Sequence, residues 1–148
     1  MINIKSKYDF PASLIERAVQ AALTNQKESM DANLSVVLTD NRRIRKLNRD
    51  YLGVDAPTDV LSFPASEPDP ETGARYMGDI LISVPYAAYG ARKAGHPLES
   101  ELQLLAVHGV LHLLGHDHAK PKEKAKMWKA QHEILTELGL GDIQIREE

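Results

Sequence analysis

The segment HGVLHLLGHDH, residues 108–118, constrains the fold of this chain more than any other stretch. It closes a mainly apolar run that starts near Pro97, and the sequence LESELQLLAVHGVLHLLG predicts one long helix there. Because this helix is apolar nearly all round, we expect it to lie at the centre of the protein. The rest of the chain must therefore supply a sheet and further helices that cover it.

Local sequence signals predict these covering elements. Helices are expected at residues 11–23, directly after Asp40, at 85–94 and at 122–138, and strands at 2–8, 33–40, 60–65 and 77–84. Ser13 and Glu16 have the spacing of a capping box, Asp40 or Asn41 can cap the second helix, and EPDPETGAR (67–75) is typical of an exposed loop. We predict one domain over residues 1–148, α+β or mixed α/β, with about four strands in a mixed sheet and about five helices.

The composition favours a cytoplasmic protein without a membrane partner. The chain is 43% apolar and 26% charged, as ordinary globular proteins are, and no apolar run approaches the roughly 18 residues of a membrane span. The first residues, MINIKSKYDF, lack the features of a secretory signal. The absence of cysteine excludes disulfides, thiol nucleophiles and cysteine-based zinc sites, and it fits a reducing compartment.

The basic residues are clustered, although the net charge is −3. This net charge argues against a protein that coats nucleic acid without selectivity. Ten of the eighteen Lys and Arg residues fall in two short stretches, Arg42, Arg43, Arg45, Lys46 and Arg49, and Lys120, Lys122, Lys124, Lys126 and Lys129. Such stretches are usually solvated helix faces, but a surface that contacts phosphates needs the same residues. The sequence leaves both interpretations open.

His108, His112 and His118 have the spacing of a metal site. Residues four apart on a helix are offset by about 40°, so the first two can bind one ion at the roughly 2.0–2.1 Å that zinc requires. Gly115 allows the helix to end in a left-handed residue, after which the chain can return His118 to the same ion. Two core histidines with separate hydrogen-bond partners are the alternative, but their neighbours are aliphatic. Three imidazole ligands leave a fourth position for water, as in catalytic sites.

The residue after the first histidine bears on the type of reaction. The pattern His-x-x-x-His-x-x-Gly-x-x-His is that of the metzincin peptidases, which place a glutamate general base directly after the first histidine. Gly109 occupies that position here. A peptidase without the base loses on the order of 10²–10⁴-fold in rate, whereas a metal can assist phosphodiester hydrolysis without it. We expect a metal hydrolase other than a standard peptidase, with Gly109 leaving room for a phosphate beside the ion.

These motifs resemble the YbeY-type endoribonucleases, a family of bacterial rRNA maturation factors. The resemblance rests on HGVLHLLGHDH, on LNRDYLG at 47–53, on DAPTDVLSFP at 55–64 and on MGDILIS at 77–83. It implies an α+β fold, a metal held by the three histidines and cleavage of single-stranded RNA. It also implies a role in 16S rRNA 3′-end processing and ribosome quality control, with ribosomal RNA and ribosome-associated proteins as partners.

The chain departs from the family at one position. Well-studied members have an arginine, thought to act at phosphate, where this chain has Leu52. Arg49 lies one helical turn earlier, and side chains at i and i+3 share a helix face. We therefore predict that Arg49 partly replaces the family arginine; an ordinary surface arginine is the alternative.

Four more polar residues lie in or near the motifs. Asp117 either orients a ligating imidazole or shapes the turn after Gly115, and His116 is expected to be exposed. Asp59 and Ser62 are interpreted as architecture that forms one wall of a cleft. The remaining histidines, at positions 96 and 132, are expected to be structural or exposed.

The sequence thus predicts a monomeric metal-dependent endoribonuclease that acts on single-stranded ribosomal RNA. The metal would be zinc, with nickel possible, because imidazole suits both ions. One alternative is a metallopeptidase whose general base is Glu123 or Glu133. Another is a ribosome-assembly factor that has no enzymatic activity and uses the metal for folding.

Overall fold

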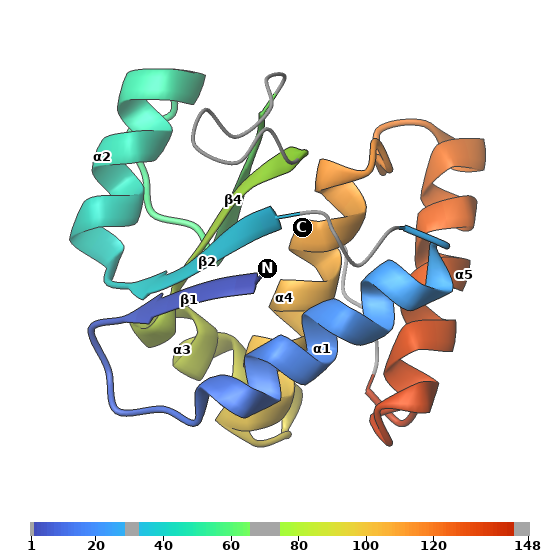
Figure 1. Ribbon diagram of the computed structural model, residues 1–148. Coiled ribbons are helices and arrows are strands. Elements are labelled where there is room, and N and C mark those ends of the chain that lie inside the picture. Colours follow the sequence, from blue (N-terminus) through green and yellow to red (C-terminus); the bar gives the residue numbers. More distant parts are fainter. Residues whose placement is uncertain (1, 29–32, 66–74, 144–148) are drawn as a thin grey trace.

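The computed structural model describes residues 2–28, 33–65 and 75–143. Within them, four strands form one sheet and five helices pack around it, so the predicted α+β class is confirmed (Figure 1). The strands are β1 (Ile2–Ser6), β2 (Asn33–Thr39), β3 (Val60–Pro64) and β4 (Tyr76–Ser83). The helices are α1 (Ala12–Asn25), α2 (Asn41–Leu52), α3 (Val84–Ala94), α4 (Leu98–Leu113) and α5 (Pro121–Glu137). No helix in these described ranges is long and apolar enough to cross a membrane.

The sheet presents two differently covered faces. Its strand order is β1-β2-β4-β3; β1, β2 and β4 are parallel, and β3 pairs antiparallel with β4 at one edge. Val36 pairs with Ile80, and Val37 pairs with Leu81. Because successive side chains point to opposite faces, the two pairs lie on opposite sides of the sheet. Val36 and Ile80 belong to the main core, whereas Leu81 and Val37 belong to a smaller cluster beside α2.

Helix α4 lies at the centre of the main core, as its apolar composition predicts. Eleven of its sixteen residues are buried, and it contacts α1, α3, α5, β3 and β4 (Figure 1). Burying one large aliphatic side chain stabilises a fold by about 1.5–3 kcal/mol, and α4 buries several, including Leu102 and Leu111. The helix that carries two of the histidines is therefore held firmly in place.

Gly109 allows α4 to lie directly against the sheet. A Cβ atom at this position would be 2.7 Å from Cγ2 of Ile80, closer than two carbon atoms pack. Ile80 is fully buried in β4 and has little room to move away. The expectation that Gly109 leaves space for a phosphate beside the ion is therefore wrong, because the side on which a Cβ would be attached faces the sheet and is filled by Ile80. Close packing of helix and sheet explains the glycine.

The helix ends agree with the sequence except at α1. This helix begins after Pro11 without a side-chain cap, so the capping box predicted for Ser13 and Glu16 is wrong. Ser13 lies within the first turn, where its backbone is helical and unlike that of an N-cap residue. The cap of α2 is confirmed, since Asp40 accepts a hydrogen bond of 2.9 Å from the backbone N–H of Arg43. The loop predicted at 67–75 lies, apart from its last residue, outside the described residues.

Candidate metal centre

Three histidine side chains meet beside the C-terminal end of α4. His108 and His112 lie one turn apart on the helix, and His118 follows in the segment that leads to α5. One ring nitrogen of each lies within 4.8 Å of the other two, and the Nε2 atoms of His108 and His112 are 3.0 Å apart. Two ligand atoms of a tetrahedral zinc ion are separated by about 3.3 Å. The separations therefore fit one shared ion after small side-chain movements.

The end of α4 explains how His118 returns to the helix. Gly115 has a φ of +95°, a left-handed conformation that glycine adopts without steric cost. Its N–H donates to the carbonyl of His112 (3.0 Å), and the N–H of His116 donates to the carbonyl of Leu111 (2.9 Å). These two bonds define a Schellman helix end. The predicted role of Gly115 is confirmed.

The residues between Gly115 and His118 have structural contacts. Oδ1 of Asp117 accepts a 2.7 Å hydrogen bond from the N–H of His118, which supports the interpretation that Asp117 shapes the turn. The Nε2 atom of His116 lies 2.7 Å from Oε1 of Gln26, next to the end of α1. His116 is therefore half-buried, and its predicted exposure is wrong because it links the turn to α1.

Helix α5 supplies two residues that the sequence interpretation did not single out. Gln131 is 1% exposed, and its Oε1 accepts a 2.9 Å hydrogen bond from Nδ1 of His108. This bond leaves Nε2 of His108 free to face the other two histidines. The Trp128 ring lies beside the rings of His118 and His108, with centroid distances of 5.5 and 6.2 Å. A polar residue at a buried position of an amphipathic helix was the available signal for Gln131.

Two of the three histidines are held as neutral imidazoles. Burial, followed by the charge of the neighbouring His112, lowers the pKa of His108 from 6.5 to about 4, although its bond to Gln131 opposes this shift. Burial and then the charge of His118 likewise lower the pKa of His112. Both imidazoles are neutral at pH 7 and offer lone pairs without first losing a proton. Three imidazoles suit zinc or nickel, whereas magnesium and calcium prefer oxygen ligands.

Asp59 directly precedes β3, and Ser62 lies within this strand, which packs beside α4. Asp59 is 3% exposed, and its Oδ1 accepts a 2.7 Å hydrogen bond from the N–H of Val60. The Oγ of Ser62 lies 3.4 Å from the carbonyl oxygen of Gly109. These contacts support the interpretation of Asp59 and Ser62 as architecture. The two histidines outside the cluster also agree with the sequence, since His96 pairs with the buried Glu101 and His132 is exposed.

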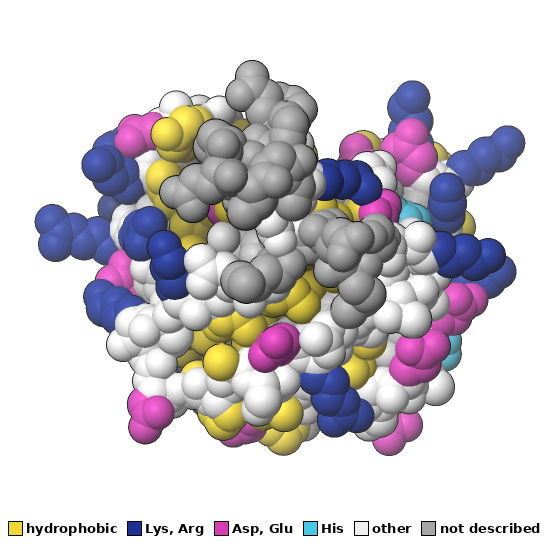
Figure 2. All heavy atoms as spheres, viewed as in Figure 1, with side chains coloured by type: hydrophobic (Ala, Val, Ile, Leu, Met, Phe, Trp, Pro, Cys, Tyr) yellow, Lys and Arg dark blue, Asp and Glu magenta, His cyan; other side chains and the backbone are white. Residues whose placement is uncertain are grey.

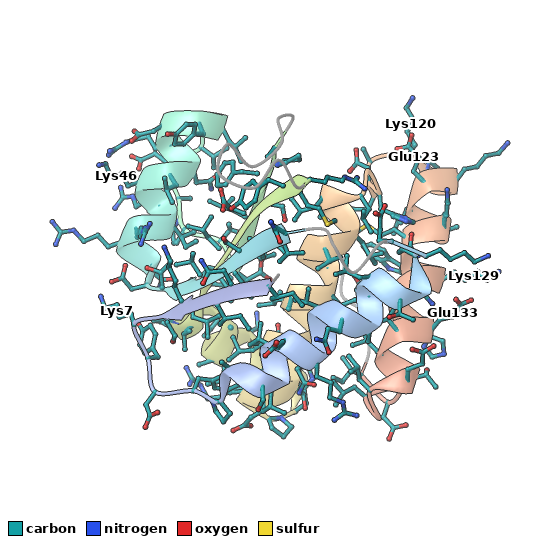
Figure 3. The ribbon with its side chains drawn as sticks, in the orientation of Figure 1. Lys7, Lys46, Lys120, Glu123, Lys129 and Glu133 are labelled. Atoms are coloured by element: carbon teal, nitrogen blue, oxygen red, sulfur yellow. The ribbon has the colours of Figure 1, made fainter. Side chains whose placement is uncertain are left out.

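The basic stretches lie on α2 and α5. Most of their side chains are exposed, and Figure 3 shows Lys46 extending from α2 and Lys120 and Lys129 from α5. Arg49 lies in the last turn of α2, where its Nε is 3.3 Å from Oδ1 of Asp50. Among the described residues, Arg49 forms no hydrogen bond or ion pair with a histidine of the cluster. Lys124 of α5 places its ammonium 5.9 Å from the centre of the Trp128 ring.

Neither candidate peptidase base is bonded to the histidine cluster. Glu133 accepts a 3.3 Å hydrogen bond from Nδ2 of Asn25 in α1. Glu123 lies exposed in the first turn of α5 (Figure 3). Within the described part of the chain, the α5 residue whose side chain is hydrogen-bonded to a histidine of the cluster is Gln131. Its amide is not a base, so this geometry gives no support to the peptidase alternative.

Comparison with known proteins gives a consistent result. Residues 2–139 match the family model described as Endoribonuclease YbeY. An Endoribonuclease YbeY of Brevibacillus brevis is 44% identical over 140 residues, covering 86% of this chain and 87% of the relative. One from Moorella thermoacetica is 45% identical over 135 residues, covering 86% of each chain. The solution structure of TM1509 from Thermotoga maritima matches with a TM-score of 0.62 at 29% identity, covering 96% of this chain and 94% of that one. The histidine cluster thus lies in a chain that belongs to the Endoribonuclease YbeY family.

Proposed function

We propose that this chain is a metal-dependent endoribonuclease that cleaves single-stranded RNA. Its role would be 16S rRNA 3′-end processing and ribosome quality control in the cytoplasm, with ribosomal RNA and ribosome-associated proteins as partners. Residues 1–148 would act as one endoribonuclease domain and as a monomer. The observation that carries the proposal is the three-histidine cluster in a member of a family of endoribonucleases.

His108, His112 and His118 are the proposed metal ligands, and zinc is the proposed ion, with nickel as the alternative. When bound, such an ion polarises a phosphodiester and lowers the pKa of water to about 7. The chain's own contribution is orientation, since Gln131 fixes which nitrogen of His108 faces the ion. The Trp128 ring lies beside His118 and His108 and forms an aromatic neighbour of the cluster.

Arg49 is proposed to supply part of the positive charge that the family arginine supplies elsewhere. Its guanidinium is about half exposed and belongs to a row of cations on α2. Leu52, at the family arginine's position, is 59% exposed and carries no charge. Arg49→Ala should therefore lower the turnover number for RNA cleavage. The same change at the exposed Arg92 of α3 is the control, and equal effects of the two changes would contradict the role of Arg49.

The direct test is cleavage of a fluorescent single-stranded RNA by wild-type protein, His112→Ala and His132→Ala. His132 lies on α5 and is exposed, so its loss controls for the removal of an imidazole. We expect wild type and His132→Ala to cleave equally, and His112→Ala to be inactive. Equal cleavage by all three proteins would indicate a contaminating nuclease and contradict the proposal.

Two further outcomes correspond to the alternatives. Binding of RNA without cleavage, together with unfolding on chelation, would indicate an assembly factor. Cleavage of a casein substrate by wild-type protein that leaves RNA intact would indicate a peptidase.

A further inference from the structure

A groove lies on the sheet face opposite α4. Its volume is about 780 Å³. Val37 of β2 and Leu81 of β4 contribute to its floor, and they point away from α4 because they alternate with residues of the main core. Leu47 and Tyr51 of α2 line it as well. The groove is thus separated from the histidine cluster by the sheet.

Aromatic rings line this groove. Tyr51 is 70% exposed, yet its ring packs edge-to-face on Phe63 of β3, with 5.6 Å between the ring centroids. Tyr76 of β4 also lines the groove. An exposed aromatic ring whose orientation is fixed by packing against a second ring offers a surface on which an unpaired base can stack.

The same groove carries free positive charge. Lys5, Lys7 and Arg43 line it, and Lys7 is paired with Asp40. Within residues 2–28, 33–65 and 75–143, neither Lys5 nor Arg43 forms an ion pair. Arg43 also lines an adjoining basic groove along α2, formed with Arg42, Arg45, Lys46, Arg49 and Asp40. Figure 2 shows Lys and Arg side chains gathered over α2 and the neighbouring end of β1, beside hydrophobic side chains.

The floor also has polar groups that suit the edge of a base. The Tyr76 hydroxyl is hydrogen-bonded to Asp79, and it lies 3.1 Å from the Oγ of Ser35. All three side chains line the groove. A carboxylate can accept hydrogen bonds from the amino groups of cytosine, and hydroxyl groups can donate or accept.

We propose that this groove binds a short unpaired segment of RNA, with bases against Tyr51 and phosphates near Lys5 and Arg43. The inference rests on the proposed function, because it gives the same RNA substrate a second contact surface away from the histidines. Stacking rings beside unpaired cations are the combination that single-stranded RNA requires. An acidic protein segment would use the cations but has no need of the exposed ring, so RNA is the better fit.

The location can be tested by the methyl NMR signals of the metal-free protein on titration with a uridine tetranucleotide. We expect saturable shifts at Val37, Leu47 and Leu81, which line the groove. Methyl groups of Val110 in α4 serve as a reference on the other face of the sheet. Shifts confined to α4 and α5 would overturn the proposal.

Variants on exposed positions test the contribution of each contact. Tyr51→Ala should weaken RNA binding at least about fivefold, the lower end of what one stacked base contributes. The double change Lys5→Glu and Arg43→Glu should weaken binding further and reduce the slope of log affinity against log salt by about 1.4, because two phosphate contacts are lost. Tyr89→Ala and Arg92→Glu, on exposed positions of α3, are matched controls. Equal affinities of groove and control variants, with unchanged melting temperatures, would overturn the proposal.

The kinetics separate this inference from the proposed function. Groove variants should raise the KM for a long RNA and leave kcat unchanged, since the histidines are intact. A wild-type protein that fails to cleave RNA would contradict the proposed function, while the NMR titration would still decide whether RNA binds the groove. Cleavage with an unaltered KM in the groove variants would overturn the groove alone. Binding of an acidic peptide in place of RNA at Val37 and Leu47 would also overturn it.

Discussion

Replacing Gly109 with alanine should destabilise the protein through contact with Ile80. The added Cβ would lie 2.7 Å from Cγ2 and 3.1 Å from both Cγ1 and Cδ1. Carbon atoms pack best at about 3.5–4.0 Å, so the helix or the strand must move by up to about 1 Å. Overpacking of this kind costs about 1–3 kcal/mol, and alanine regains about 1 kcal/mol of helix propensity. The expected net loss in the free energy of unfolding is therefore up to about 2 kcal/mol.

A double-mutant cycle in urea, followed by circular dichroism on metal-free protein, isolates this contact. Ile80→Ala removes all three contacting atoms and by itself should cost about 2–5 kcal/mol, because Ile80 is fully buried. In that background Gly109→Ala should be neutral or stabilise the protein by about 1 kcal/mol. An equal loss for Gly109→Ala with and without the Ile80 side chain would refute the close packing of α4 on the sheet. The same contact predicts that Gly109→Glu unfolds the protein and creates no peptidase.

Three other predictions concern the metal centre and the basic surface. Gln131→Leu should weaken metal affinity about 10–100-fold in a chelator competition, because His108 loses its orienting bond; unchanged affinity would exclude that role. In metal-free protein the pKa of His108 is about 4 instead of 6.5, so between these values the unfolded chain binds more protons. The contribution of His108 to the free energy of unfolding should be fully present above pH 6.5, and about 3 kcal/mol should be lost as the pH falls to 4. A free energy of unfolding, measured in urea, that does not change over this pH range would contradict the burial of His108. Changing Arg42, Arg45 and Lys46 to alanine should weaken RNA binding and flatten its salt dependence. If fluorescence anisotropy gives an unchanged slope of log affinity against log salt, these residues form only a solvated helix face.

Much of this architecture is predictable because its signals are local. The apolar run around His108 and His112 predicts the central helix, and the glycine at position 115 predicts its left-handed end. The four strands follow from short β-rich segments. Local signals do not predict the start of α1 correctly, because the N-cap position is Pro11, two residues before the serine that is expected to cap the helix.

The remaining features depend on which elements meet in space. Gln131 is separated from His108 by more than twenty positions, and its role depends on the packing of α5 against α4. Whether the Cβ position of Gly109 points towards Ile80 depends on the rotation of α4 about its own axis relative to the sheet. The groove lined by Tyr51 requires the register that places Val37 and Leu81 on the same face of the sheet. Spacing along one chain carries none of this information.

The most direct test of the central claim is the metal content of the purified protein. Inductively coupled plasma mass spectrometry should find close to one equivalent of a divalent transition metal per wild-type chain. The variant His108→Ala/His112→Ala, which lacks two of the three converging nitrogens, should contain almost none. Full occupancy in this double variant, with its fold intact by circular dichroism, would contradict the three-histidine metal centre.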